Sequence, residues 1–331
     1  MANTKGISVI IPNYNGTILL PQILPPLFIA LQNTKLSYEV ILSDDCSTDN
    51  TIDFLKTNYP QLILIESKVN EGFSKTINKG IFLAKYDYLL LLNSDVKLNE
   101  NYFDTLIPYF DLPDTFGVMG RIIGWDNDEI QDGGKYPSFH GVKIKTSGNY
   151  IPLDPKPTDK LYSMYLSGAN ALVSRKKIMA LKGFDEIFSP FYVEDFELSL
   201  RAWRLGWKCY YDHTAICRHQ TSTTIKSKSS KAYVRKIYNR NKMILHAIHL
   251  PKNKLWLWYV QLFGETILQT VLGRFWFVAG VKMLLGMGEA IKKSRIKFLL
   301  VSEKEKSKIS LKELVSYLQK SIKSKIIKRF E

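Results

Sequence analysis

Residues 88–95 read Tyr-Leu-Leu-Leu-Leu-Asn-Ser-Asp, an apolar run that ends in three polar residues. A short run without polar alternation is typical of a strand that is buried on both faces, as in a parallel sheet covered by helices. The polar tail Asn93-Ser94-Asp95 then lies in the loop where this strand ends. The segment therefore predicts an α/β fold with functional groups at the strand's carboxyl end.

The segments before it repeat the pattern of strand followed by helix. Helix-capping residues at 47–49 precede an apolar helical pattern, and a second helix is expected after the third strand. The strands are expected at Ile7–Pro12, Glu39–Ser43, Leu62–Ile65 and Tyr88–Leu92, and the second helix at Ser74–Ala84. This βαβαβαβ order predicts a Rossmann-like, mostly parallel sheet with helices on both faces.

Periodicity is weak over residues 111–160, which contain many Gly, Pro and Asp residues. We expect irregular structure with short strands there. Regular elements are expected again at Leu172–Val173 (strand), Lys176–Leu181 (helix), Asp195–Leu205 (helix) and Cys209–Tyr211 (strand).

Acidic residues follow strands or open a helix at three places. They are Asp44-Asp45, Asp95 and Glu194-Asp195. Carboxylates at such positions are expected to converge at the carboxyl edge of the sheet, where a phosphate-bearing ligand and a divalent cation would lie. The alternative for Asp195 is a helix N-cap.

Seven motifs, in order, resemble those of family 2 glycosyltransferases with the GT-A fold. They lie between residues 6 and 225 and read Ser8-Val9-Ile10-Ile11-Pro12-Asn13-Tyr14-Asn15-Gly16, Ser43-Asp44-Asp45-Cys46-Ser47-Thr48-Asp49, Asn70-Glu71-Gly72-Phe73 with Asn78-Lys79-Gly80, Leu92-Asn93-Ser94-Asp95-Val96, Ser167-Gly168-Ala169-Asn170, Gly183-Phe184-Asp185-Glu186 and Glu194-Asp195-Phe196-Glu197-Leu198.

The resemblance implies a role for individual residues. Asp44 matches the aspartate that contacts the donor base, Asp95 the last acid of the metal-binding DxD-type motif, and Asp195 the general base. Asn93 stands where many members have a first carboxylate. The nucleotide-sugar candidates are Pro12, Tyr14, Asn15, Asp44, Asp45, Asn70, Gly72, Lys75, Asn78, Asn93 and Ser94, and the acceptor-side candidates are Gly168, Ala169, Asn170 and Glu194.

A further metal ligand is required if Asp95 supplies the only carboxylate. His219 is the candidate, because some members place a metal-binding histidine at about this distance beyond the base; a merely exposed or satisfied histidine is the alternative. Lys75, near an expected helix N-terminus, is either a phosphate contact or a solvated lysine. The chain shows no Cys/His cluster of zinc spacing, so an oxygen-ligated cation, Mg or Mn, is expected.

The sequence also indicates the compartment. Three cysteines without paired spacing, Cys46, Cys209 and Cys217, favour a reducing environment, and the N-terminus has no export signal. These features favour a cytoplasmic location, peripheral on the inner face of the cell membrane.

The net charge of +15 is concentrated in the C-terminal third. Residues 226–242 contain seven basic and no acidic residues, and residues 291–331 contain thirteen basic and four acidic ones. Between them, Leu255–Met287 is apolar and aromatic, but Glu265, Arg274 and Lys282 interrupt it before the length of a membrane-spanning helix is reached.

We therefore divide the chain into a catalytic domain, 1–225, and a helical region, 226–331, that associates with an anionic membrane surface. The apolar part is expected as two helices joined near Gly273 or as a segment packed on the catalytic body, and a solvated helical hairpin is the alternative to membrane association. No nucleic-acid module is visible, so nucleic acid is not an expected partner.

The function expected from these features is transfer of a sugar, with inversion, from a nucleotide-diphosphate sugar to a hydroxyl of a lipid-linked glycan in the synthesis of a surface polysaccharide such as O-antigen or capsule. The alternative is a non-catalytic nucleotide-sugar-binding or scaffold protein. A dehydrogenase or nucleotidyltransferase is disfavoured because no Gly-rich dinucleotide fingerprint or Walker-type loop follows the first strand. The sequence leaves the sugar and the oligomeric state open.

Overall fold

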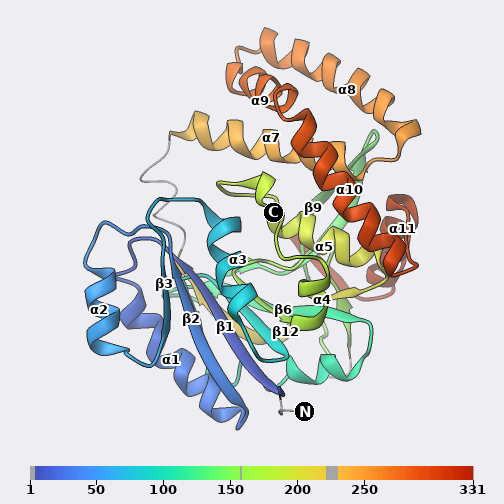
Figure 1. Ribbon diagram of the computed structural model, residues 1–331. Coiled ribbons are helices and arrows are strands. Elements are labelled where there is room, and N and C mark those ends of the chain that lie inside the picture. The colour runs from blue at the N-terminus through green and yellow to red at the C-terminus, as the bar shows by residue number, and fades with distance from the viewer. Residues whose placement is uncertain (1–3, 157–158, 221–229, 331) are drawn as a thin grey trace.

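The N-terminal half forms the expected parallel sheet. The computed structural model describes residues 4–156, 159–220 and 230–330 (Figure 1). Strand β1 (Gly6–Asn13) lies between β2 (Ser37–Asp44) and β4 (Tyr88–Leu92), and β3 (Ile63–Glu66) continues the sheet beyond β2, all in parallel. The expected strands are therefore confirmed.

Helices cover both faces of this sheet, as expected. Helices α1 (Leu20–Asn33) and α2 (Thr51–Asn58) share one buried cluster with Val9 and Leu42, whereas α3 (Phe73–Leu83) shares the other with Ile10 and Ile41. Successive residues of a strand point to opposite faces, so β1 and β2 contribute alternately to the two layers.

The expectation of irregular structure over residues 111–160 was wrong. After β5 (Val96–Leu98) and the short helix η1 (Ile107–Asp111), β6 (Thr115–Gly124) is a ten-residue strand of the central sheet, buried at nine positions. A Cβ at Gly117 or Gly120 would lie 2.6 Å from the carbonyl oxygen of Leu172 or Ala215. The neighbouring backbone thus lies too close to leave room for a side chain at either position, so both residues must be glycine. Glycine is unusual inside a strand, and for that reason the sequence pattern did not predict β6.

The second half of the central sheet is mixed. Strand β11 (Asn170–Ser174) runs antiparallel to β4 and β6, and β12 (Lys208–His219) runs parallel to β6. The short strands β7 (Ile130–Asp132) and β10 (Leu161–Tyr162) pair with β6 and β12. Strand β12 is longer than expected, so His219 is its last residue rather than lying beyond it.

A separate three-stranded sheet pairs a hairpin from the middle of the chain with a strand near residue 330. It contains β8 (Gly134–His140), β9 (Lys143–Pro152) and the C-terminal strand β13 (Ile327–Phe330), which pairs antiparallel with β9. The region after residue 226 was expected to be helical throughout, and β13 corrects that expectation. Cross-strand pairing ties the C-terminus to the catalytic body.

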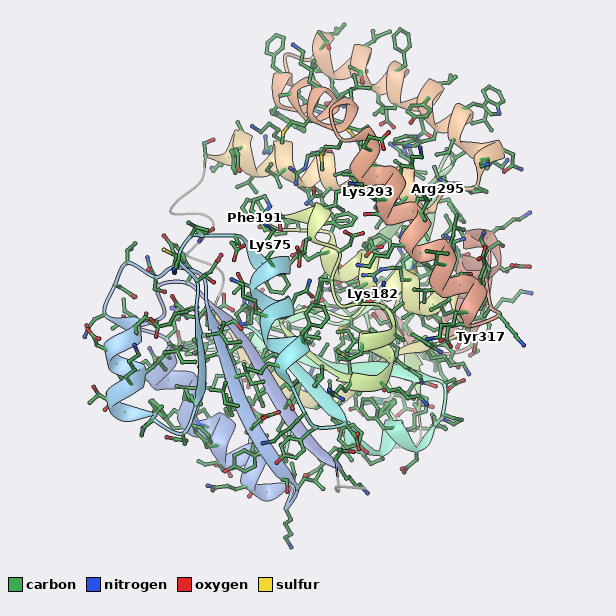
Figure 2. All side chains as sticks on the ribbon, viewed as in Figure 1. Lys75, Lys182, Phe191, Lys293, Arg295 and Tyr317 are labelled. Carbon is green, nitrogen blue, oxygen red and sulfur yellow. The ribbon has the colours of Figure 1, made fainter. Side chains whose placement is uncertain are left out.

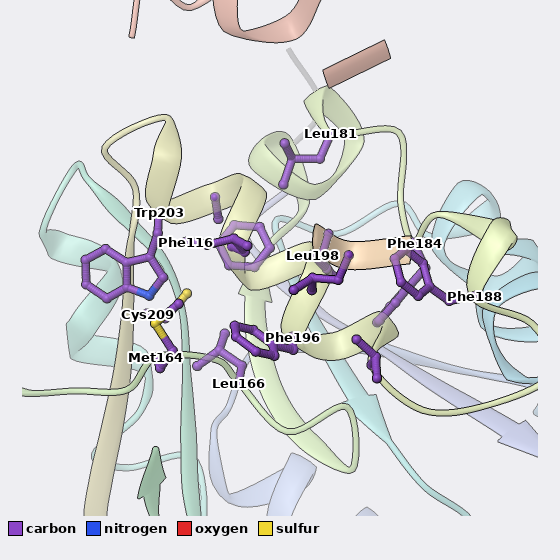
Figure 3. Packing of buried hydrophobic residues seen from close by; sticks show 14 of the residues in the cluster. Phe116, Met164, Leu166, Leu181, Phe184, Phe188, Phe196, Leu198, Trp203 and Cys209 are labelled. Atoms are coloured by element: carbon purple, nitrogen blue, oxygen red, sulfur yellow. The ribbon is translucent and has the colours of Figure 1, made fainter. Parts of the chain in front are cut away.

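Helix α5 (Glu194–Arg204) lies at the centre of the larger hydrophobic cluster (Figure 3). Its Phe196, Leu198 and Trp203 pack among residues of the central sheet and its connections, and Trp203 Nε1 donates to the Ser163 carbonyl at 3.0 Å. Helix α4 (Arg175–Ala180) and the turn η2 (Glu186–Phe188) precede it. This packing fixes the position of the helix that begins with Glu194-Asp195.

The C-terminal region continues with α7 (Lys231–His249), α8 (Lys252–Val271), α9 (Phe275–Leu285), α10 (Gly288–Lys304) and α11 (Leu311–Lys323). Helices α8 and α9 meet at Gly273, whose φ of +68° suits glycine. Leu245 of α7 and Leu314 of α11 belong to the same core cluster as α5. The expected domain boundary at 225/226 falls outside the described residues and stays a prediction.

Within residues 4–156, 159–220 and 230–330, no helix is both long and apolar enough to cross a bilayer.

Candidate active site

The carboxyl ends of β1 and β2 bring Asn13 beside Asp44, their last residues in register. Asn13 Nδ2 donates to Asp44 Oδ1 at 2.9 Å, and the Ser47 backbone N–H and hydroxyl donate to the same carboxylate at 2.8 and 2.5 Å. Asp44 is 2% exposed. Three donors therefore hold this carboxylate fixed at the edge of the sheet.

The loop after β1 is fastened to the loop after β2 through Asn15. Its φ is +56°, which asparagine tolerates better than most residues, and its Oδ1 accepts the Thr48 N–H at 2.8 Å. Pro12 and Tyr14, on either side of Asn13, are partly exposed. These residues lie beside Asp44 at the carboxyl edge of the sheet.

Asp45 shapes the neighbouring loop. Its two carboxylate oxygens accept the backbone N–H groups of Glu71 and Gly72 at 2.8 and 2.9 Å, and Asn70 Nδ2 donates to its carbonyl at 3.1 Å. The side chains of Asp45 and Asn70 are thus occupied in holding the turn before α3.

At Gly72, the turn before α3 packs against the loop that precedes α5. Its φ is +84°, and a Cβ there would lie 2.7 Å from Pro190 Cα, so a side chain does not fit. The Phe73 N–H donates to the Pro190 carbonyl at 2.9 Å. Figure 2 shows Lys75 of α3 and Phe191 of this loop on the facing segments.

Two residues of α3 differ in what they can offer a ligand. Lys75 is partly exposed, and its Nζ lies 3.8 Å from the Glu71 carboxylate. Its ammonium group therefore stands near the start of α3, where a ligand can reach it. Asn78 is buried, donates to the Phe184 carbonyl and the Glu186 carboxylate, and accepts the Phe184 N–H. Its side chain ties α3 to residues 184–186, so we no longer regard it as a nucleotide-sugar contact.

Asp95 and His219 come together from distant parts of the chain. Strand β5 pairs antiparallel with the end of β12, with Val96 opposite His219. Asp95 Oδ2 lies 3.6 Å from His219 Nε2, and the Gln220 N–H donates to the Asp95 carbonyl at 3.1 Å. Asn93 and Ser94 are partly exposed beside them.

The chemistry of this pair fits a divalent cation. His219 Nδ1 lies 3.0 Å from Gln131 Oε1, an acceptor, so Nδ1 carries a proton and Nε2, 3.6 Å from Asp95 Oδ2, is the ring nitrogen that would bind a cation. Asp95 Oδ1 is buried without a hydrogen-bond partner. Among the described residues, no group of three or more His, Cys, Asp or Glu side chains is placed to hold a metal. By itself the pair could supply only part of a coordination shell.

Asp195 is the second residue of α5 and is partly buried. Its Oδ1 accepts the Phe196 N–H at 2.7 Å. Burial raises the pKa of Asp195 above the ordinary aspartate value, while the Phe196 N–H, the charge of Lys135 and the Gly168 N–H oppose the rise. A carboxylate with a raised pKa accepts a proton more readily than an ordinary aspartate.

Glu194, next to it, is buried and its Oε2 has no hydrogen-bond partner. Burial, followed by the charge of Asp195, raises the pKa of Glu194. Two adjacent carboxyls with raised pKa values at a helix start are typical of a functional site.

The segment 168–170 connects the Asp95 side to the Asp195 side. The Ala169 carbonyl accepts the Asn93 N–H at 3.1 Å, and a Cβ at Gly168 would lie 3.8 Å from Asp195 Cβ. Asn170, by contrast, is fully buried and donates to the Gly120 carbonyl at 3.0 Å. Asn170 therefore belongs to the core between β6 and β11, and we withdraw it as an acceptor contact.

Sequence reasoning missed Asn241 of α7. Its Nδ2 lies 2.6, 3.0 and 2.8 Å from the carbonyl oxygens of Phe188, Phe191 and Tyr192, and it is fully buried. Tyr192 and Val193 have φ of +74° and +77° directly before Glu194, a conformation that costs a β-branched residue energy. Asn241 holds this strained turn, and nothing in the basic pattern around it marks such a role.

Lys135 of β8 was also missed, because it lies in the segment expected to be irregular. It forms an ion pair with Asp132 and lies 5.2 Å from the ring centroid of Tyr165, which in turn stacks on Phe196 at 5.3 Å. Its charge lowers the pKa of Asp195. A cation beside the helix start thus comes from the second sheet.

The two halves of the site, at Asp95 and at Asp195, lie at the carboxyl edge of an α/β sheet that resembles solved GT-A transferases. A structure of GalNAc-T7 with UDP, GalNAc and Mn2+ superimposes with a TM-score of 0.66 over 98% of this chain and 59% of that chain, at 17% identity. The mannosyltransferase PcManGT from Pyrobaculum calidifontis, with GDP-Man and Mn2+, gives 0.52 over 97% and 85%, at 13% identity. These likenesses establish the GT-A fold.

The chain belongs to glycosyl transferase family 2, whose model matches residues 8–181. The N-acetylglucosaminyl-diphospho-decaprenol L-rhamnosyltransferase of Mycobacterium tuberculosis (strain CDC 1551 / Oshkosh) is 25% identical over 226 residues, covering 60% of this chain and 71% of the relative. Chondroitin synthase of Escherichia coli is 25% identical over 260 residues, covering 69% of this chain and 36% of the relative. The protein is a glycosyltransferase.

Proposed function

We propose that this glycosyltransferase moves a sugar, with inversion, from a nucleotide-diphosphate sugar to a hydroxyl of a lipid-linked glycan, with Mg or Mn bound at Asp95 and His219. One observation carries the proposal: the 168–169 segment contacts both the Asn93–Asp95 loop and Asp195. The proposed cation site, two residues beyond Asn93, and the proposed base therefore adjoin the same short stretch of backbone.

The donor would lie along the edge formed by β1, β2 and β4. Asp44 is the proposed contact to the nucleotide base, since its carboxylate is fixed by three donors and Oδ2 accepts only one of them. Asn15, Asn93 and Ser94 are proposed to line the path toward Asp95. Asp45, Asn70 and Gly72 would act indirectly, by holding the loop that begins α3.

When bound, the cation would offset the negative charge that develops on the leaving diphosphate. Asp95 would contribute its unpartnered Oδ1, and His219 its Nε2 lone pair, with Gln131 keeping the ring in the required tautomer. The two GT-A structures contain Mn2+ with a nucleotide or a nucleotide-sugar, which supports the cofactor proposed here.

Asp195 would take the proton of the acceptor hydroxyl as its oxygen forms a bond to the anomeric carbon. The bond from that carbon to the diphosphate oxygen breaks, and its electron pair leaves with the nucleoside diphosphate. Attack from the face opposite the leaving group inverts the configuration. A positioned base of this kind contributes about 10² to 10⁴ in rate.

The proposed acceptor is a lipid-linked glycan at the cytoplasmic face of the membrane. The name of the mycobacterial relative specifies a decaprenol diphosphate carrying N-acetylglucosamine, which supports this class of acceptor. The basic C-terminal third suits the anionic surface on which such lipids lie.

A panel of nucleotide-diphosphate sugars tests the proposal. The melting temperature is measured with and without Mn, since a ligand present at about 100 times its Kd stabilises the native state by about 2.7 kcal/mol. The donor that raises it is then incubated with lipid-linked glycan acceptors, and product is detected by mass spectrometry. If the protein binds a donor but neither transfers its sugar to any acceptor nor hydrolyses it, the result would favour the non-catalytic alternative.

A further inference from the structure

The outer side of α8 is an apolar surface without a partner in the described part of the chain. Six large side chains follow one another at helical spacing along it, each between 51% and 79% exposed; we call them the α8 stripe: Trp256, Tyr259, Val260, Phe263, Ile267 and Val271. Figure 1 shows α8 at the edge of the molecule farthest from the N-terminus.

The opposite side of the same helix already packs on the protein. Trp258 and Leu262 are buried there, and α8 lies against α9. Helix α8 is therefore apolar on two faces, whereas a surface helix of a globular protein normally needs only one apolar face. Contiguous exposed apolar side chains of this size mark an interaction surface.

Charge around the stripe indicates what covers it. Glu265 is the acidic residue of α8, and it forms an ion pair with Lys143 on the packed side. Exposed cations stand at both ends of the helix, with Lys252 and Lys254 before the stripe and Arg274 after it. Residues 252–304 contain nine Lys or Arg and three Asp or Glu. The partner should therefore be apolar and negatively charged at its rim.

A second copy of the chain fits this pattern poorly. Antiparallel pairing of two α8 helices about a two-fold axis would place Lys252 and Lys254 of each copy beside Arg274 of the other, cation against cation. An anionic bilayer instead offers acyl chains to the stripe and phosphate groups to its cationic ends. Trp256 and Tyr259 are the residue types that favour the boundary between these two layers.

We propose that α8 lies flat in the interface of an anionic bilayer, with the α8 stripe inserted among the acyl chains. The helix α9 packs against both α8 and α7, and α7 carries Asn241, which holds the loop before Asp195. This proposal builds on the proposed function, because it places the enzyme on the membrane that holds the lipid-linked acceptor. Its test needs neither donor nor acceptor, so either proposal can fail without the other.

The test is binding of the full chain to vesicles of phosphatidylcholine, with or without phosphatidylglycerol, by flotation. We expect binding to the anionic vesicles that weakens with added salt. The double variant Phe263→Ser with Ile267→Ser should lower partitioning of the protein into the vesicles at least about tenfold. Each substitution removes an inserted side chain, and burial of one large apolar side chain favours binding by roughly tenfold or more. Both positions are exposed, so the melting temperature should stay close to that of the wild type.

The matched control replaces two equally exposed apolar residues elsewhere. Leu153→Ser with Ile326→Ser should leave vesicle binding unchanged. Acyl-brominated lipid should quench tryptophan fluorescence in the wild type, and Trp256→Phe should remove most of that quenching while the protein stays bound.

Three results would overturn the proposal. The wild type could fail to float with anionic vesicles, or the α8 double variant could float as well as the wild type. A change from dimer to monomer in that variant, with no vesicle binding by the wild type, would assign the stripe to a second copy.

Discussion

Gly72 packs against Pro190, so the turn that begins α3 touches the loop that leads into Asp195. A Cβ at Gly72 would lie 2.7 Å from Pro190 Cα, and the Phe73 N–H donates to the Pro190 carbonyl. The same turn is held from its other side by Asp45. The loop on the proposed donor side therefore contacts the loop that leads to the proposed base. Substitutions in one loop should change the position of the other.

Removing the charge of Glu194 should stabilise the protein at neutral and alkaline pH. Because burial raises the pKa of Glu194 in the folded state, the native protein binds more protons than the unfolded chain, and stability is lost as pH rises through the raised pKa. Glu194→Gln should gain on the order of 1 to 3 kcal/mol at pH 8, with the gain shrinking toward acid. Denaturant unfolding at several pH values measures it, and a pH-independent difference would contradict the assignment.

Gln131 should tune the metal site without contacting the cation. It accepts the Nδ1 proton of His219, and loss of such a partner typically lowers metal affinity by about 10- to 100-fold. Titration calorimetry of Mn in the presence of nucleoside diphosphate measures this for Gln131→Ala, with the exposed Gln22→Ala as control.

We also expect Mn and nucleoside diphosphate to bind cooperatively, because Asp95 and His219 form an incomplete shell. Independent binding of the two ligands would count against this expectation.

Asn241→Ala should slow transfer more than it weakens donor binding. The substitution removes the Asn241 amide from three carbonyl oxygens, leaves Arg240 with the Ser189 carbonyl but without the Asn241 acceptor, and frees the strained turn at Tyr192 and Val193. We expect a loss of stability of about 1 to 3 kcal/mol and a fall in kcat with a nearly unchanged donor KM. Asn239→Ala, at a partly exposed asparagine on the same helix, is the control. Equal changes in kcat for both variants would refute a positioning role.

The parts of the fold that the sequence predicted are those with local periodicity. The strand at 88–92 and the helix after residue 73 follow from apolar patterning within a few residues. Strand β6 was missed because Gly117 and Gly120 interrupt its pattern, and the reason for these glycines is contact with β11 and β12, which no local window contains. The C-terminal strand β13 depends in the same way on its pairing with β9.

The candidate site divides similarly. The positions of Asp44 at a strand end and Asp195 at a helix start were predictable from the sequence pattern, whereas the roles of Asp44, Asp95 and Asp195 come from the family resemblance and stay proposals. Asn78 and Asn170 carry the same motif signal, yet each uses its side chain to hold backbone in the core. Asn241 and Lys135 come from elements whose approach to α5 is set by tertiary packing, so their contacts could not be foreseen from spacing.

The rate of sugar transfer by Asp195→Asn tests the central claim most directly. Asparagine keeps nearly the same volume and can still accept the Phe196 N–H through its amide oxygen. The N-cap of α5 is Val193 and no side chain in the described part of the chain caps the helix, so Asp195 is not the cap and its replacement should change folding and donor affinity little. Only proton removal is lost.

We predict that transfer by Asp195→Asn falls by at least about two orders of magnitude, while donor binding and melting temperature stay close to the wild type. Asp114→Asn, which removes a partly exposed carboxylate paired with Lys208, should transfer sugar at the wild-type rate. Wild-type transfer by Asp195→Asn would remove this residue from the mechanism and contradict the account.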